Sequence, residues 1–358
     1  MKRVGFLALG LSLTVSGFAQ DLIRNPAKPL APEPGRVLKL ETVYEIRDDS
    51  GAFFFKYPFR FDLDPKGCFY VLDQDQLLKF GSDGKFLLNL YKKGQGPGEI
   101  GSNFQMVSFF AQDDSITVYD GRGKIMRLDG TGRLVEEIRQ SAGRFFILLG
   151  PAGKGFYMHG QTPVGIGQGV GFKDVESAVH LVSPDGGTAE RIIAFTSRVY
   201  EGSNFGMDWD NYLQVLNRRD GSLYVSHTCE YKVVRADLAL RKAVAAFTRD
   251  YRRVPFVVKD YEKDFYARNN PPKKDFENDI AGLFICGENV WVKTSTINED
   301  KGAFFDVFDP QGRFLDGFFL PKGLTLALAD GPFVYVMEKE EDESIVFKKC
   351  RMLNGPKS

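Results

Sequence analysis

The sequence lacks an excess of charge of either sign, because 47 Lys and Arg residues balance 47 Asp and Glu residues among 358. Proteins that bind the phosphate backbone of nucleic acids usually carry a basic excess. Long apolar runs are also missing beyond the first 20 residues, and a membrane helix needs roughly 20 consecutive apolar residues. We therefore expect neither a nucleic-acid partner nor a membrane span in the mature chain.

Histidine is scarce, and the three residues, His159, His180 and His227, do not cluster with acids in the sequence. A metal hydrolase or a propeller lyase needs histidines and acids that converge on one point. A GxSxG motif, which would favour a serine hydrolase, is absent as well. The sequence therefore predicts no catalytic residues.

Four cysteines allow three complete disulfide pairings, and none has the CxxC spacing of a metal or redox site. Cys68 lies early in the chain and Cys350 lies late, so closure of a ring would bring their segments together. A bond between Cys68 and Cys350 is one possibility. The alternative is that Cys68, Cys229, Cys286 and Cys350 are all isolated thiols.

The chain begins like a secretory signal peptide. Lys2 and Arg3 precede an apolar stretch over residues 4–15, and Gly17 and Ala19 are the small residues of a cleavage site after Ala19. No cysteine near that site offers a lipid anchor. We predict that residues 1–19 are removed and that the mature protein is periplasmic or secreted. Residues 20–36 are rich in proline and are expected to form an extended leader rather than packed structure.

One strand pattern recurs six times in the rest of the chain. A turn with Gly or Asp leads into alternating aromatic and β-branched residues and ends in a polar residue; the copies are 65–73, 113–120, 152–159, 220–227, 287–294 and 330–338. Hairpins with tight turns follow most copies, at 77–90, 125–138, 180–195 and 304–320, and in a degraded form at 233–247, where Asp237 replaces the glycine turn. Helical periodicity is weak throughout.

About four strands in each of six units predict an all-β fold, a six-bladed β-propeller of four-stranded antiparallel blades over residues 37–353, with a tail at 354–358. The last unit is one strand short. We therefore predict that residues 37–46 complete the sixth blade and close the ring. A monomer is expected.

Residues 80–99 carry a resemblance to a known family. Gly84-Lys-Phe-Leu followed by Gly94-Gln-Gly-Pro-Gly-Glu99 resembles bacterial six-bladed β-propellers related to NHL-repeat proteins, which carry a GxGPGE box after the first blade. The strand end at 70–73 and the segment Tyr251-Arg-Arg-Val-Pro255 are similar to that family as well. The resemblance implies the propeller fold, export and a binding role. The box itself is predicted to be structural, with Glu99 accepting hydrogen bonds from backbone amides.

Function in a propeller usually lies on the loops at one mouth of the ring. Three insertions are long enough to shape such a mouth: 160–178, which is rich in glycine and lacks a strand pattern, 196–210 and 250–279. The last two are rich in aromatic residues and arginine, as recognition surfaces are. The predicted ligand-binding residues are Arg198, Tyr200, Trp209, Tyr251, Arg252, Arg253, Tyr261 and Arg268. The alternative is that these aromatic side chains only anchor the loops.

The leading prediction is thus a non-catalytic binding or scaffold propeller of a bacterial envelope, without a cofactor, whose ligand is a protein, a peptide or a glycan. The competing hypothesis is an NHL-like lyase or lactonase that holds Ca²⁺ on rim carboxylates. Its candidate ligands are Asp73, Asp120 and Glu338, which end equivalent strands in different blades. Equivalent blades hold such residues well apart, however, and we expect each of these carboxylates to cap its own turn instead.

Overall fold

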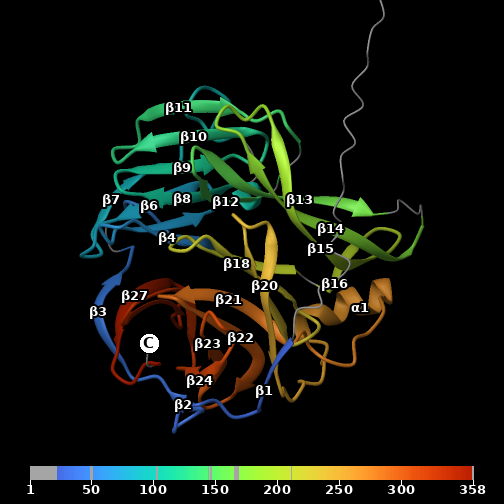
Figure 1. Ribbon diagram of the computed structural model, residues 1–358. Helices are drawn as coiled ribbons and strands as arrows, with labels where there is room; N and C mark the ends of the chain where they lie inside the picture. The colour runs from blue at the N-terminus through green and yellow to red at the C-terminus, as the bar shows by residue number, and fades with distance from the viewer. Residues whose placement is uncertain are drawn as a thin grey trace, which may run out of the picture.

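The computed structural model describes residues 22–356 apart from 49–50, 102–103, 144, 146, 165–168 and 211. The described residues form six small sheets arranged in a ring, which is a six-bladed β-propeller (Figure 1). The predicted fold is therefore confirmed. The predicted signal peptide lies outside the described residues.

The blades follow one another along the chain. Blade 1 consists of β4 (Pro58–Leu63), β5 (Phe69–Asp73), β6 (Gln76–Phe80) and β7 (Phe86–Asn89). Blade 2 consists of β8 (Ser108–Gln112), β9 (Ser115–Tyr119), β10 (Lys124–Asp129) and β11 (Leu134–Arg139). Blade 3 consists of β12 (Ile147–Ala152), β13 (Gly155–Val164), β14 (Gly171–Val182), β15 (Ala189–Glu201) and β16 (Gly206–Asp210). Blade 4 consists of β17 (Tyr212–Asn217), β18 (Ser222–His227), β19 (Lys232–Asp237) and β20 (Lys242–Arg249). Blade 5 consists of β21 (Ile280–Cys286), β22 (Asn289–Asn298), β23 (Gly302–Phe308) and β24 (Phe314–Leu320). Blade 6 includes β25 (Leu324–Asp330), β26 (Phe333–Lys339) and β27 (Ile345–Met352).

The first strands of the blades, β4, β8, β12, β17, β21 and β25, surround the axis of the ring. Each contacts the first strand of the blade before it and of the blade after it. The hydrophobic core lies between blades rather than within one sheet. Between blades 6 and 1, for example, the ring of Phe69 lies 5.0 Å from that of Tyr335 and 5.5 Å from that of Phe347, centroid to centroid. Packing on both faces explains why all five residues of β5 are buried.

The ring is closed by β3 (Leu40–Ile46), which pairs antiparallel with β27 and supplies the fourth strand of blade 6. Ile46 lies opposite Phe347 in this ladder, and both side chains are buried. The strand predicted at residues 37–46 therefore has the expected role. Closure by the two ends of the chain makes blade 6 depend on residues that are about 300 positions apart.

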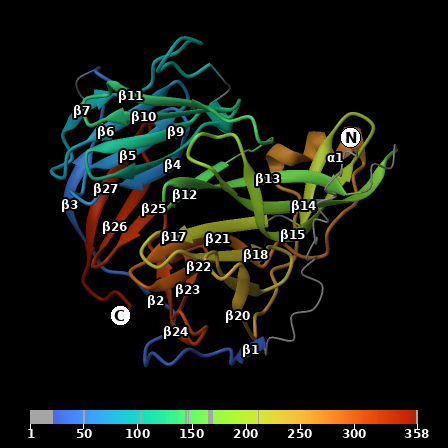
Figure 2. The same ribbon diagram turned by 45° about the horizontal axis from the view of Figure 1, so that its top comes forward.

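The expectation of an unpacked leader is wrong for the described part of residues 20–36. β1 (Leu22–Asn25) adds a parallel strand to the outer edge of blade 4 at β20, and β2 (Arg36–Val37) adds one to blade 5 at β24 (Figure 2). Arg36 also donates two hydrogen bonds to the buried Asp316 carboxylate, at 2.8 and 2.7 Å. The prolines restrict the backbone conformation of the stretch between β1 and β2. The partner strands lie about 220 to 280 residues away in the sequence, so no local pattern predicts the pairing.

The Gly94–Glu99 box connects blade 1 to blade 2. As predicted, the Glu99 carboxylate accepts a hydrogen bond from a backbone amide of the box, that of Gly96, at 2.8 Å. The buried ammonium group of Lys124 donates to the carbonyl oxygens of Gly96 and Glu99, at 2.8 and 2.9 Å. The box is therefore a connection between two blades that is held by hydrogen bonds to its own backbone.

All four cysteines are free thiols. Cys68 packs into the core between blades 1 and 2, whereas Cys350 packs between blades 5 and 6, so the pairing of these two residues does not occur. The described residues include one α-helix, α1 (Lys263–Asn269), and two 3-10 helices, η1 (Phe104–Met106) and η2 (Asp260–Glu262). Within the described ranges, no helix is long and apolar enough to cross a membrane.

Candidate functional site

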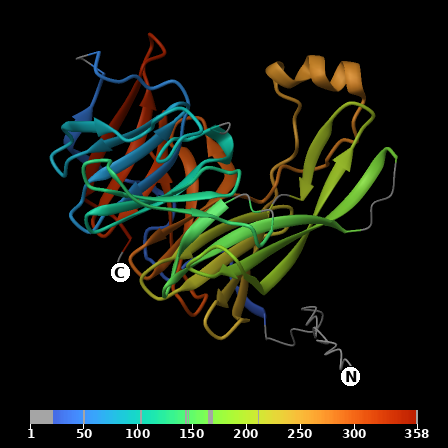
Figure 3. The same cartoon turned by 90° about the horizontal axis from the view of Figure 1, so that it is seen from above.

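The long insertions gather on one face of the ring, which we call the arm face. It is the face on which the first strand of every blade begins and the second strand ends, as in the pairs Pro58 with Asp73 and Tyr212 with His227. Two hairpins of blade 3, β13–β14 and β15–β16, extend beyond the other blades on this face, and α1 lies beside the β15–β16 hairpin (Figure 3).

Two of the predicted insertions are therefore not loops. Residues 160–178 were expected to lack strands, yet β13 continues to Val164 and β14 begins at Gly171. Residues 196–210 were expected to form a connecting segment, but they are the end of β15 and all of β16, which pair through Tyr200 and Met207. The glycines in this stretch interrupt the alternating pattern by which a strand is predicted. The strands form nonetheless, because pairing with neighbouring strands stabilises them where the local β-propensity is low.

A row of aromatic side chains joins the two hairpins and the helical segment. Neighbouring rings in the row lie 4.8 to 6.0 Å apart; in order they are Trp209, Phe172, Tyr200, Phe205, Phe265, Tyr266 and Phe256. Phe172 is 49 % exposed and Tyr261, on η2 of the same segment, is 77 % exposed. Val170 and Val257 add exposed aliphatic side chains. We call the seven rings, with Tyr261, Val170 and Val257, the arm–helix surface.

Hydrogen bonds fix the helical segment on blades 3 and 4. The Lys274 ammonium group donates to the Trp209 carbonyl oxygen and lies 5.2 Å from the centroid of the Trp209 ring. It also donates to the Asn278 side-chain oxygen at 2.8 Å. Asn278 in turn donates to the Thr228 hydroxyl at 2.8 Å. The position of α1 relative to the hairpins is thus set by several polar contacts as well as by ring packing.

The predicted ligand-binding residues divide into two groups. Tyr200, Trp209 and Tyr261 belong to the arm–helix surface. Arg198 lies on β15 but pairs with Asp174 at 3.2 Å. Arg268 lies on α1 and donates to the Asp264 carbonyl oxygen of the same helix.

The other three predicted residues lie where the segment leaves blade 4. Tyr251 packs against Tyr231 and bonds Thr296, which makes it part of the core between blades 4 and 5. Arg253 pairs with the buried Asp279 at 2.9 Å, so it holds the segment in place. Arg252 is exposed and makes no hydrogen bond or ion pair within the part of the chain that the structure describes.

Phe172 and Phe265 were missed by the sequence reasoning. Phe172 lies in the stretch that was expected to lack strands. Phe265 lies on α1, whose seven residues are too few to show a helical period.

The proposed Ca²⁺ ligands do not come together. Asp73 is buried in blade 1 and accepts hydrogen bonds from the amides of Lys56 and Tyr57, at 2.6 and 2.8 Å. Asp120, in blade 2, accepts from the amides of Arg122 and Lys124, at 2.7 and 2.9 Å.

Glu338, in blade 6, pairs with Lys348 at 2.6 Å. The described residues contain no group of three or more His, Cys, Asp or Glu side chains that could hold a metal ion.

Two histidines lie at the base of the arms, between blades 3 and 4. The buried His159 ring stacks on Tyr212 with centroids 5.6 Å apart, and neither ring nitrogen has a hydrogen-bond partner. Burial lowers the pKa of His159 to about 4, with a smaller contribution from His180. His227 bonds Asp210 at 3.2 Å. The arms therefore rest on a neutral, stacked histidine at neutral pH.

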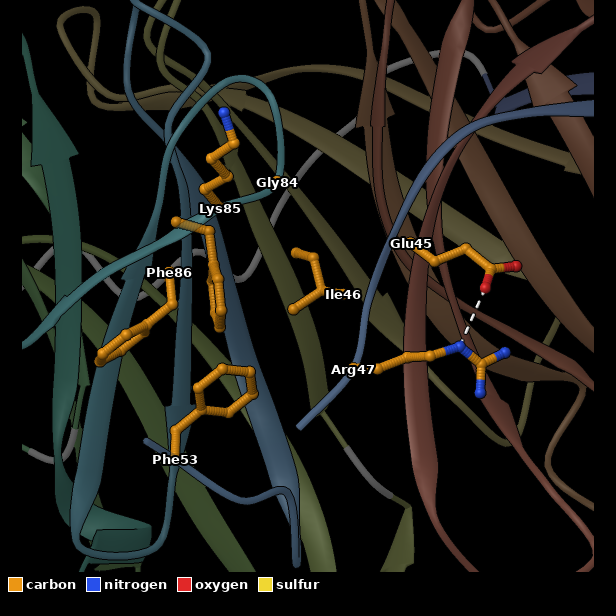
Figure 4. A pocket seen from close by; sticks show the side chains of 8 residues that line it. Glu45, Ile46, Arg47, Phe53, Gly84, Lys85 and Phe86 are labelled. Atoms are coloured by element: carbon orange, nitrogen blue, oxygen red, sulfur yellow. Dashed lines mark hydrogen bonds and ion pairs between the residues drawn. The ribbon is translucent and has the colours of Figure 1, made fainter. Parts of the chain in front are cut away.

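A pocket of about 390 Å³ lies elsewhere, at the seam between β3 and blade 1 (Figure 4). Its apolar wall includes Ile46, Phe53 and Phe86, and its charged side chains are already paired: Arg47 with Glu45 and Glu340, and Lys85 with Asp83. We assign this pocket to ring closure, because it offers a ligand no unpaired charge.

Comparison with known proteins supports the fold. Residues 63–161 match the profile of a family described as 6-bladed beta-propeller. A protein of Bacteroides fragilis that is described as exported is similar in structure, with 12% sequence identity, a TM-score of 0.51 and coverage of 93% of this chain and 99% of that one. A member of the DUF4221 family from Bacteroides vulgatus has 10% identity, a TM-score of 0.53 and coverage of 89% and 99%.

A gluconolactonase from Xanthomonas campestris has 14% identity, coverage of 90% and 99%, and a TM-score of 0.43, which is too low to support an argument about activity. None of the curated proteins matches the chain in sequence. These findings support the six-bladed β-propeller fold of the chain. The finer relation to NHL-repeat proteins stays a prediction.

Proposed function

We propose that this protein is an exported, non-catalytic propeller that binds a protein or peptide partner on the arm–helix surface. The observation that carries the proposal is the row of seven contacting aromatic rings, which is assembled from β14, β15, β16 and the 250–279 segment. Export is supported by the charged and apolar start of the chain.

Exposed apolar side chains on a rigid support are typical of protein interaction sites. The Phe172 ring contacts those of Trp209 and Tyr200, which are half-buried, so it is held in place before a partner arrives. Tyr261 adds an exposed ring from η2. Arg252, in the same 250–279 segment as Tyr261, adds an exposed charge without an ion pair among the described residues. Preorganised aromatic and arginine side chains bind at a low cost in conformational entropy.

A protein or peptide suits this surface better than a glycan. A sugar ring stacks on an open aromatic face, whereas the Trp209 indole already contacts the Phe172 ring, with centroids 4.8 Å apart, and the Lys274 ammonium group. The exposed neighbours Val170 and Val257 are aliphatic and offer a sugar no hydrogen bonds.

The proposal is tested by placing a photo-activatable phenylalanine analogue at position 172 or 261 of the mature protein in an envelope extract. Position 240 is the matched control, because Leu240 is 61 % exposed and lies on the β19–β20 turn, on the opposite face. We expect one and the same partner to be cross-linked from positions 172 and 261 but not from 240. Equal cross-linking from all three positions would contradict the proposal.

A further inference from the structure

We infer that Arg60, on the innermost strand of blade 1, is the binding residue for an anionic group, a carboxylate or a phosphate, of a small ligand that approaches along the axis from the arm face. This site is separate from the arm–helix surface, and its argument does not depend on the partner proposed there. It rests on one contrast between two neighbouring positions of β4.

Arg60 and Asp62 are two residues apart on β4, so their side chains project from the same face of the strand. The Asp62 carboxylate has a full set of partners. It pairs with the Arg218 guanidinium of blade 4 and accepts a hydrogen bond from the Ala111 amide of blade 2, at 2.7 Å. Arg218 also donates to the Ala111 carbonyl oxygen at 2.9 Å.

Arg218 thereby links blade 4 to blades 1 and 2 at the end of the axis opposite the arm face. The next residue, Arg219, pairs with Asp330 of blade 6 at 3.1 Å. Two consecutive arginines of the β17–β18 turn therefore tie together the first strands of three other blades. These ion pairs lie between Arg60 and the face opposite the arm face, so the inferred approach of a ligand to Arg60 is from the arm face.

Arg60 has no such partner. Its side chain is partly buried, its guanidinium carbon lies 5.6 Å from the centroid of the Phe59 ring, and its Nε is buried without a hydrogen bond. It forms no ion pair in the part of the chain that the structure describes. Burial lowers the pKa of Arg60, in keeping with the lack of a paired carboxylate.

A partly desolvated charge without a counter-ion costs stability. An uncompensated cost of this kind is typical of a functional site, where it is offset when the ligand binds. A guanidinium presents a fork of N–H donors that fits a carboxylate or a phosphate. Both anions use the same geometry, so the experiment must distinguish between them.

The test uses the mature protein and the variants Arg60→Met and Arg218→Met. Methionine keeps much of the length of the side chain and removes the charge. In buffer without either anion, we expect Arg60→Met to melt at the same temperature as the wild type or higher. Arg218→Met should melt lower, because it leaves the Asp62 carboxylate without its partner. A lower melting temperature for Arg60→Met would show a structural role and overturn the inference.

The second part adds inorganic phosphate or succinate, with sodium chloride of equal ionic strength as the control for screening. We expect one of these anions to raise the melting temperature of the wild type and to leave that of Arg60→Met unchanged. A response to phosphate alone assigns a phosphate site, and a response to succinate alone assigns a carboxylate site. Equal shifts in both proteins, or no shift in the wild type, would overturn the inference.

Discussion

Phe205, at the tip of the β15–β16 hairpin, contacts Phe265 of α1 edge to face, with ring centroids 5.1 Å apart and ring planes at 86°. The two residues belong to different insertions. They are 60 positions apart in the sequence, and strands β17 to β20 of blade 4 lie between them. Their contact joins two structures that the blades present separately. Together with the bond from Lys274 to Trp209, this contact makes the hairpins and the helical segment one surface.

Replacing Phe265 by alanine is expected to release α1 from the hairpin without unfolding the propeller. The ring is half-buried and lies outside the six interblade cores, so the free energy of unfolding should change by no more than about 1 kcal/mol. Hydrogen exchange should become faster at residues 263–269 and 200–206. Tyr261→Ala, which removes an exposed ring, is the control and should leave both rates unchanged. Unchanged exchange in Phe265→Ala would contradict the role of this contact.

The Gly94–Glu99 box allows a double-mutant test. A Cβ at position 94 would lie 2.0 Å from the Glu99 Oε2, and Gly94 has a φ of +155°. We expect Gly94→Ala to lower the free energy of unfolding by at least about 2 kcal/mol. Glu99→Ala alone should cost about 1 kcal/mol, through loss of the bond from Gly96.

In the Glu99→Ala background, Gly94→Ala should cost clearly less, because the clashing carboxylate is gone. Urea denaturation of the four proteins gives the coupling energy. If the losses in the free energy of unfolding from Gly94→Ala and Glu99→Ala were simply additive, a clash with the Glu99 carboxylate would not explain why position 94 requires glycine.

The N-terminal segment that carries β1 and β2, residues 22–37, which we call the strap, is expected to stabilise blade 5 through Arg36. Arg36→Ala leaves the Asp316 carboxylate, whose side chain is only 5% exposed, without its ion pair. We expect a loss of roughly 2 kcal/mol, less than the 3–5 kcal/mol of a fully buried pair because Arg36 itself is partly exposed. Arg133→Ala, which removes an arginine from an exposed pair with Asp129, is the control and should have little effect. Equal melting temperatures for the two variants would contradict a packed strap.

The free energy of unfolding should depend on pH through His159, which lies on β13 and stacks on Tyr212 of blade 4. The pKa of this histidine is lowered from 6.5 to about 4 by burial, so between these values the unfolded chain binds a proton that the folded chain does not. The free energy of unfolding should therefore fall as the pH falls from 6.5 to 4, by roughly 3 kcal/mol in total from this group.

His159→Phe keeps a ring against Tyr212 and removes the titrating group, so its stability should depend less on pH over this range. The difference between the two pH profiles, measured by urea denaturation, isolates the contribution of His159. Parallel profiles would show that the imidazole takes up its proton without cost.

The propeller could be predicted from the sequence because its strands repeat a local pattern. The copy at 65–73 corresponds to β5, and the orphan strand at 37–46 was placed correctly because ring closure requires a partner for β27. The strap could not be predicted in this way. β1 and β2 are short, and what makes them strands is the open edge of β20 and β24, far along the chain.

The candidate surface was predicted only in part. Tyr200, Trp209 and Tyr261 were identified from composition, whereas Tyr251 and Arg253 turned out to serve packing and an ion pair. Phe172 was missed because the glycines around it hid a hairpin that forms by pairing with β15. Arg60 carried no sequence signal, since its distinction is the lack of a partner, which appears only when the blades surround the axis.

The claim that the arm–helix surface is where this protein binds is tested most directly by hydrogen–deuterium exchange of the mature chain with and without the partner identified by cross-linking. We predict slower exchange at residues 170–174, 199–209 and 257–268 in the complex. Protection confined to the opposite face, such as the turns at 64–68 and 237–242, would contradict the account.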